Sequence, residues 1–304
     1  MSFGRTVKAT LYTLVFLMVC GPVGGQNVEP TKIVVHGIEL HYIEQGQGQS
    51  LIFVHGGSGD YRSWESQLKI FSPGFHTVSY SRRYSYPNQN QFAAKNHSAL
   101  MEAEDLAGLI DKLKLGRVHV VGASYGAFTA LVFALKHPDL VRSLVLAEPP
   151  VHQLIRDTPE GEAAYQEFMT NVMKPAGEAF KAGNDQGAMK ILSDGISGPD
   201  RWQRLTPEGR AAVMQNSRFF EVLTMSSDPF PKLSKAKLRR LPTPTLIITG
   251  ETTTPIHKLV TRELARLLPN AESVIIPAAG HASNRDNPQA FNAAVLKFLA
   301  QHSN

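Results

Sequence analysis

The sequence predicts an α/β protein whose mostly parallel sheet is interrupted by a helical insertion. Three observations lead to this prediction. Short apolar runs that could form buried strands alternate with segments of helical length, which is typical of parallel sheets connected by helices. The alternation stops over residues 151–231, where helix formers dominate, and then returns. The 304-residue chain has ordinary apolar content, so it can bury one large core.

Residues 1–25 are predicted to be a secretory signal peptide. Arg5 and Lys8 precede an uncharged run at residues 9–20, and small residues follow it at 21–25. The run is shorter than the roughly 20 apolar residues that a transmembrane helix needs. We therefore expect export to the periplasm or the cell exterior, without stable membrane insertion after cleavage. An uncleaved N-terminal anchor is the alternative, and a mature exported protein that still begins at residue 1 would contradict cleavage.

The composition argues against several classes of function. The net charge is +5, and +3 without residues 1–25, which hold two of the 31 basic residues. This charge is too mild to indicate nucleic-acid binding. Cys20 is the only cysteine and lies in the predicted signal peptide, so no disulfide framework is expected. No spaced His/Cys/Asp cluster indicates a metal site, and no cofactor is expected. A small-molecule substrate is the expected partner, and nothing predicts an oligomeric state.

The first part of the predicted core, residues 26–150, begins with strands. Residues 32–36 and 38–43, separated by Gly37, predict an antiparallel pair. A buried strand at 51–54 then leads into a glycine-rich turn at 55–59. The elements expected after this turn are a strand at 75–79, a helix at 98–114 and strands at 118–121 and 140–147.

The stretch Gly122-Ala123-Ser124-Tyr125-Gly126 matches the G-x-S-x-G pattern of a nucleophile elbow. It follows the buried strand at 118–121 and opens an apolar helix at 125–137, which is the required context. The two glycines let the backbone turn sharply without a Cβ clash, so the serine hydroxyl is exposed. The start of the following helix favours developing negative charge. Ser124 is therefore predicted to be a nucleophile.

The turn His55-Gly56-Gly57-Ser58-Gly59 comes about 70 residues before the elbow. In isolation it would be interpreted as a simple loop. In this position it could present the amide of Gly57 beside the amide of Tyr125. Together the two donors would bind the oxyanion of a tetrahedral intermediate, an effect worth about 3 kcal/mol per donor.

His281 is the predicted general base. The second part of the core, residues 232–304, predicts strands at 244–249 and 273–276, with helices at 257–268 and 288–300. His281 lies in a loop just after the last strand, and the order serine first, histidine last, favours catalysis. The remaining histidines that we interpret as structural are His36, His41, His76, His97, His119, His137, His152, His257 and His302.

The motifs His-Gly-Gly at 55–57, Gly-Ala-Ser-Tyr-Gly at 122–126 and Gly-His at 280–281 occur in this order. In combination they resemble the α/β-hydrolase-fold serine hydrolases with a helical cap, a group with esterases, lactonases and meta-cleavage-product hydrolases. The resemblance covers residues 31–148 and 241–301. It implies an eight-stranded, mostly parallel sheet flanked by helices, with residues 151–231 as the cap. It also implies cofactor-free cleavage of a carboxylic ester or related acyl bond of a small, partly apolar substrate.

The acid of the catalytic triad departs from the pattern of this group. The group usually has an Asp in a Gly-x-x-Asp arrangement after the strand at 246–249, and here Thr253 stands in that place. Either Glu148 or Glu251 could supply the carboxylate, or there is none. We favour Glu148, because it ends a core strand and two prolines hold it rigidly. Alternatively, Glu148 caps a loop or pairs with an arginine such as Arg82.

Residues for substrate binding are predicted less directly. Arg82 and Arg83 could hold a substrate carboxylate through their planar guanidinium groups, although structural contacts to neighbouring loops are the favoured interpretation. Trp202 and Phe219 are the predicted apolar contacts from the insertion. They belong to a set that could line a pocket or only pack helices: Met169, Met173, Phe180, Trp202, Phe219 and Phe220.

Two other functions stay open from the sequence. A carbon–carbon bond hydrolase would use the same three residues on a diketo acid. A non-catalytic ligand-binding protein is the alternative from another class, and Thr253 motivates it. The presence of both Ser124 and His281 argues against this second alternative.

Overall fold

The computed structural model describes residue 1 and residues 29–303. The predicted signal peptide therefore lies, apart from Met1, outside the described residues. Among the described helices, none combines the length and apolar character needed to span a membrane.

Eight strands form one sheet in the order β1-β2-β4-β3-β5-β6-β7-β8. The pairs β1/β2 and β2/β4 are antiparallel and the others are parallel, which confirms the predicted mostly parallel sheet. The strands are β1 (Thr31–Val35), β2 (Ile38–Gln45), β3 (Gln49–Val54), β4 (Phe75–Tyr80), β5 (Val118–Ala123), β6 (Val141–Ala147), β7 (Thr245–Gly250) and β8 (Ala271–Ile276).

The two faces of the sheet bury separate clusters of apolar side chains. Because side chains alternate along a strand, Ile52 and Val54 face one cluster while Leu51 and Phe53 face the other. The first cluster includes side chains of α2 (Ala99–Lys112), α3 (Tyr125–Lys136) and α11 (Pro255–Leu267). The second includes side chains of α1 (Glu65–Phe71) and α13 (Pro288–Gln301).

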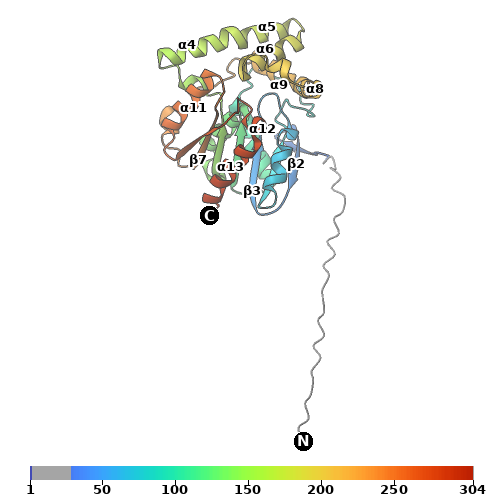
Figure 1. The fold of residues 1–304 in the computed structure, drawn as a ribbon. Helices are drawn as coiled ribbons and strands as arrows, with labels where there is room; N and C mark the ends of the chain where they lie inside the picture. The colour runs from blue at the N-terminus through green and yellow to red at the C-terminus, as the bar shows by residue number, and fades with distance from the viewer. Residues whose placement is uncertain (2–28, 304) are drawn as a thin grey trace.

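Helices dominate the connection between β6 and β7. Figure 1 shows α4, α5, α6, α8 and α9 gathered at one end of the molecule, and a π-helical turn at Met169–Met173 joins α4 to α5. The division of the chain at residues 151 and 231 into a core and a cap stays a prediction. The helices of this connection are α4 (Pro159–Phe168), α5 (Lys174–Lys181), α6 (Asp185–Ser197), α7 (Arg201–Arg204), α8 (Pro207–Gln215), α9 (Ser217–Met225) and α10 (Lys235–Leu238).

The topology brings three predicted site residues to the same edge of the sheet. Ser124 follows β5, Glu148 follows β6, and His281 lies in the loop after β8. These strands are parallel, so their carboxyl ends meet at one edge, where open α/β sheets bind ligands.

Candidate active site

Ser124 lies in a strained turn between β5 and α3. Its backbone has φ 51° and ψ −124°, a combination that non-glycine residues rarely adopt. The turn is held from both sides, because the Ser124 amide donates to the Ala147 carbonyl (2.7 Å) and the Ser124 carbonyl accepts from the Ala127 amide (2.9 Å). The surrounding structure therefore fixes the serine in this conformation.

The flanking glycines are required by close approach of neighbouring backbone. A Cβ atom on Gly122 would lie 2.6 Å from the Cα of Ala127, and one on Gly126 would lie 2.3 Å from the Val54 carbonyl oxygen. Neither backbone neighbour can move away cheaply. This confirms the expectation that both glycines avoid a Cβ clash.

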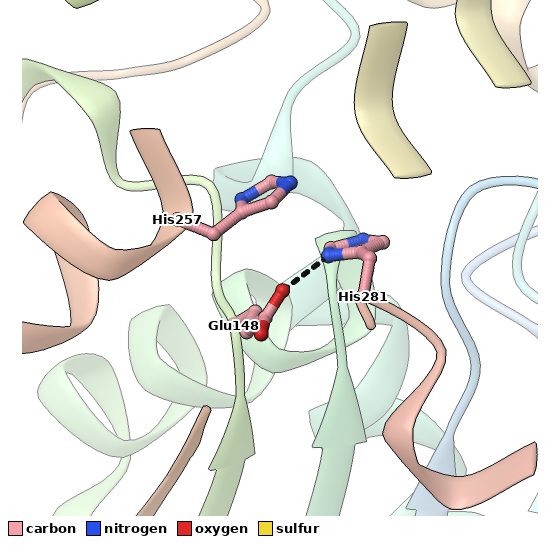
Figure 2. Close-up of side chains that lie close together, drawn as sticks. All are labelled: Glu148, His257 and His281. Carbon is pink, nitrogen blue, oxygen red and sulfur yellow. Dashed lines mark hydrogen bonds and ion pairs between the residues drawn. The ribbon is translucent and has the colours of Figure 1, made fainter. Parts of the chain in front are cut away.

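Glu148 accepts hydrogen bonds through both of its carboxylate oxygens. Its Oε2 accepts from His281 Nδ1 (2.6 Å) and from Thr253 Oγ1 (2.8 Å), and its Oε1 accepts from the Gly250 amide (2.7 Å). The contact to His281 is drawn in Figure 2. Burial alone would raise the pKa of Glu148. The hydrogen bond and charge of His281, the nearby His257 and the Gly250 amide together hold that pKa below its usual value.

The two alternatives to Glu148, which were an acid at Glu251 and no acid at all, do not match the geometry. Thr253 lies where the Asp was expected, and its hydroxyl donates to Glu148 instead of contacting His281. Glu251 is exposed and accepts from the Ala278 amide (2.8 Å). The structure thus brings Glu148, and not Glu251, to His281.

His281 lines the same pocket as Ser124. With Nδ1 donating to Glu148, the neutral ring carries an unprotonated Nε2. This Nε2 has no hydrogen-bond partner among residues 29–303. A serine hydroxyl and an unprotonated imidazole nitrogen that share a pocket are the groups needed for nucleophilic catalysis.

The glycine-rich loop after β3 lies against the elbow. The Gly56 carbonyl accepts from His55 Nδ1 (2.8 Å), Arg82 Nη2 (3.1 Å) and the Gly59 amide (3.2 Å). Because the carbonyl of Gly56 and the N–H of Gly57 belong to one planar peptide and point opposite ways, these bonds fix the direction of the Gly57 N–H. Tyr125 is the first residue of α3, so its amide has no partner inside the helix.

The prediction that Arg82 and Arg83 bind a substrate carboxylate is wrong. Arg82 is buried, and its guanidinium donates to Glu102 Oε2 (2.5 Å) and to the His55 carbonyl (3.0 Å). Arg83 makes a two-pronged ion pair with Asp105 (2.6 and 2.8 Å). Neither lines a pocket at Ser124. Both make structural contacts, which was the favoured interpretation: Arg82 holds the loop at residues 55–56, and Arg83 is tied to helix α2. Glu102 also explains why Arg82 is not paired with Glu148.

Trp202 and Phe219 are also not pocket residues. Trp202 is buried in α7, and Phe219 packs between the Arg82 guanidinium (4.2 Å to the ring centroid) and the Tyr125 ring (5.0 Å between centroids). The next residue, Phe220, lines both pockets at Ser124. Neighbouring residues on a helix point about 100° apart, so the pattern alone did not select the right phenylalanine.

Two pockets meet at Ser124 and share Gly57, Ile196 and Phe220. The first pocket adjoins His281 and has a mixed polar lining. The second is lined mainly by apolar side chains. The lining of the first pocket also includes Ser63, Arg201 and Arg285, and that of the second includes Tyr125, Pro150, His152, Phe168, Met173, Leu223, Phe230 and His257.

A second histidine lies against His281. The ring of His257, from α11, stacks on the ring of His281 with centroids 4.2 Å apart and planes 17° from parallel (Figure 2). Its Nε2 donates to the Ile196 carbonyl (3.1 Å). Burial, followed by the charge of His281, lowers the pKa of His257 to about 4. His257 was interpreted as a structural histidine, and its place just after the carboxyl end of β7 was the signal that it lies near the site.

Glu148, His257 and His281 are the one group among the described residues that has ligand atoms close enough for a metal ion, all within 4.8 Å. The two rings stack in nearly parallel planes, so their in-plane lone pairs do not converge on one point. Glu148 Oε2 and His281 Nδ1 are also bonded to each other. Hydrogen bonding accounts for this cluster better than metal ligation does.

An eight-stranded, mostly parallel sheet that carries a serine in a strained strand–helix turn defines the class of α/β hydrolases. The chain belongs to this family, because the family model described as "alpha/beta hydrolase fold" matches residues 49–288.

Named relatives support this membership. The chain is 26% identical over 277 residues to 2-(acetamidomethylene)succinate hydrolase of Mesorhizobium japonicum, covering 88% of this chain and 94% of the relative. It is 25% identical over 281 residues, with the same coverage, to 2-hydroxy-6-oxononadienedioate/2-hydroxy-6-oxononatrienedioate hydrolase of Burkholderia vietnamiensis.

Solved structures show the same fold. A thermophilic esterase from Thermogutta terrifontis superposes with a TM-score of 0.73 at 22% identity, covering 91% of this chain and 100% of the esterase. An enol-lactonase from Burkholderia xenovorans gives a TM-score of 0.71 at 21% identity, with 89% and 100% coverage.

Proposed function

We propose that the protein is an exported serine hydrolase that cleaves a carboxylic ester or related acyl bond of a small, partly apolar substrate. The observation that carries this proposal is the 2.6 Å contact between His281 Nδ1 and the buried Glu148 carboxylate, beside the pocket that contains Ser124. Export is proposed from the signal-peptide pattern at residues 1–25 alone.

The proposed mechanism follows from the positions of these groups. His281 Nε2 takes the proton of Ser124 Oγ as that oxygen attacks the carbonyl carbon, and the oxyanion is held by the amides of Gly57 and Tyr125. Glu148 keeps His281 in the required tautomer and balances the charge of the imidazolium. His281 then gives its proton to the leaving group. A water molecule, deprotonated by the same histidine, releases the acyl group from Ser124.

The helical segment at residues 151–231 is proposed to act as a cap. This proposal is supported by the residues that the segment contributes to the pocket at Ser124, which are Leu192 and Ile196 from α6 and Phe220 from α9. An apolar cover of this kind excludes water and favours a partly apolar substrate.

The proposal is tested with a series of 4-nitrophenyl esters of increasing acyl length, using wild type and Ser124→Ala. We expect turnover by wild type and a loss of at least about 10³-fold in kcat for the variant, because the nucleophile is removed. Equal activity of the two proteins would show that the hydrolysis does not use Ser124.

A second candidate reaction is carbon–carbon bond hydrolysis of a diketo acid. The relative from Burkholderia vietnamiensis is named as a hydrolase of 2-hydroxy-6-oxononadienedioate, and this similarity favours the second candidate. A diketo acid added to the ester series separates the two reactions. A kcat/KM on the diketo acid that exceeds that on every ester would replace the ester assignment.

A further inference from the structure

The two pockets at Ser124 can be assigned to the two halves of the substrate, if the proposed function holds. His281 lines the first pocket and not the second, whereas Tyr125 lines the second and not the first. Because His281 must return its proton to the leaving group, the leaving group lies in the first pocket. The acyl group then extends into the second.

The second pocket suits an uncharged acyl group. Its apolar lining includes Phe168, Leu223 and Phe230. Its two histidines are neutral at pH 7, because burial lowers the pKa of His152 to about 3 and that of His257 to about 4. No charged side chain therefore faces the acyl group from the described residues that line this pocket.

The first pocket contains two arginines from different elements. Arg201 comes from α7, and Arg285 comes from α12 (Ser283–Asp286), the short helix that follows His281. Arg285 donates to Ser63 Oγ (3.1 Å) and makes no ion pair with any described residue. Within residues 29–303, the one ion pair of Arg201 is a long contact to Asp286 (3.6 Å).

Two acidic groups lie near Arg285, namely Asp286, which contacts Arg201, and Asp60. The charge of Asp60 is already neutralised. Asp60 accepts two hydrogen bonds from the Arg62 guanidinium (2.6 and 2.9 Å) and another from Asn216 (2.9 Å). The side of the site that takes the leaving group therefore has excess positive charge. Arg285 is exposed, so a ligand can reach it.

We propose that the leaving group of the substrate carries a carboxylate, which Arg285 binds together with Arg201. A guanidinium matches the two oxygens of a carboxylate and prefers it to a neutral group. The substrate class is thus an ester between an uncharged acyl group and a hydroxycarboxylic acid, which is released as the leaving group. Arg285 and Arg201 take the carboxylate-binding role that was the less favoured interpretation of Arg82 and Arg83.

The test compares 4-(butanoyloxy)benzoate with 4-(butanoyloxy)benzamide, which carry a charged and a neutral group of similar size at the same position of the leaving group. Wild type should have a kcat/KM at least about tenfold higher on the benzoate, as expected for a charge-assisted hydrogen bond. Arg285→Gln should reduce this ratio to about one, and Arg201→Gln should reduce it less. Arg204→Gln is the matched control and should keep the wild-type ratio. Arg204 is an exposed arginine that lies in α7, like Arg201, but lines neither pocket.

A third ester places the carboxylate on the other side of the scissile bond. Monophenyl succinate carries its charge on the acyl group and should show no advantage over phenyl butanoate. A benzoate that has no advantage, or an advantage that survives Arg285→Gln, would overturn the inference while leaving the ester hydrolase intact.

Binding of the released acid separates this inference from the proposed function. Calorimetric titration with 4-hydroxybenzoate and 4-hydroxybenzamide requires no turnover. We expect wild type to bind the benzoate at least about tenfold more tightly, and Arg285→Gln to lose this preference. Equal binding of the two compounds by wild type would refute the carboxylate site, whether or not the esters are cleaved.

Discussion

At the scale of single residues, Glu148 explains how the chain accommodates a threonine where related hydrolases are expected to have an aspartate. β6 and β7 are adjacent in the sheet, so a carboxylate at the end of β6 reaches the amide of Gly250, the last residue of β7, and the hydroxyl of Thr253 just after it. Glu148 itself has a positive φ of 47°, which turns the chain at the end of its strand. Thr253 thus supports the carboxylate that replaces the expected one.

Replacement of Glu148 by glutamine keeps the size of the side chain and removes its charge. We expect kcat to fall by on the order of 10³ to 10⁴, because an amide neither fixes the tautomer of His281 nor balances the imidazolium. Steady-state kinetics on the best ester measures this effect. Glu251→Gln is the matched control and should lose less than tenfold. A large loss for Glu251→Gln and a small loss for Glu148→Gln would instead identify Glu251 as the acid of the triad.

The residues that could be predicted from sequence are those fixed by the backbone. Ser124 follows from a motif that needs glycines on both sides, and His281 follows from its place after the last strand. Arg82 could not be assigned, because its burial depends on Glu102, which comes from a helix further along the chain. The hydrogen bond from Thr253 to Glu148 could not be predicted for the same reason, since this bond joins two segments that are distant in the sequence.

At the scale of elements, all eight strands could be predicted, since each is a short apolar run that ends at a turn signal. Their bounds differ from the expected ones by at most two residues, for example at β3 (Gln49–Val54) against 51–54 and at β5 (Val118–Ala123) against 118–121. The long helices of the core were predicted equally well. The helices between β6 and β7 were expected as a group, but which of their side chains reach Ser124 depends on helix packing that periodicity does not encode.

At the scale of the whole molecule, buried histidines make the fold sensitive to acid. Burial is the main cause that lowers the pKa of four of them: His55 and His152 to about 3, and His119 and His257 to about 4. An unfolded chain protonates histidine near pH 6.5, so below that pH the unfolded state binds protons that the folded state does not. The free energy of unfolding therefore falls as the pH drops from about 6.5 to about 4.

Urea unfolding at several pH values measures this effect. Each of the four histidines contributes a slope of at most about 1.4 kcal/mol per pH unit, so the stability should be flat above pH 7.5 and should drop clearly by pH 5. The buried Glu102, whose pKa is lowered to about 2, loses its contribution only at lower pH. A free energy of unfolding that stays constant between pH 7.5 and 5 would show that these histidines are accessible to protons in the folded protein.

Covalent labelling is the most direct test of whether Ser124 is an activated nucleophile. The full chain and its Ser124→Ala variant are exposed to a fluorophosphonate, and the intact masses are then measured. We expect one adduct on wild type and none on the variant. No adduct on wild type, or an adduct that persists in the variant, would contradict it.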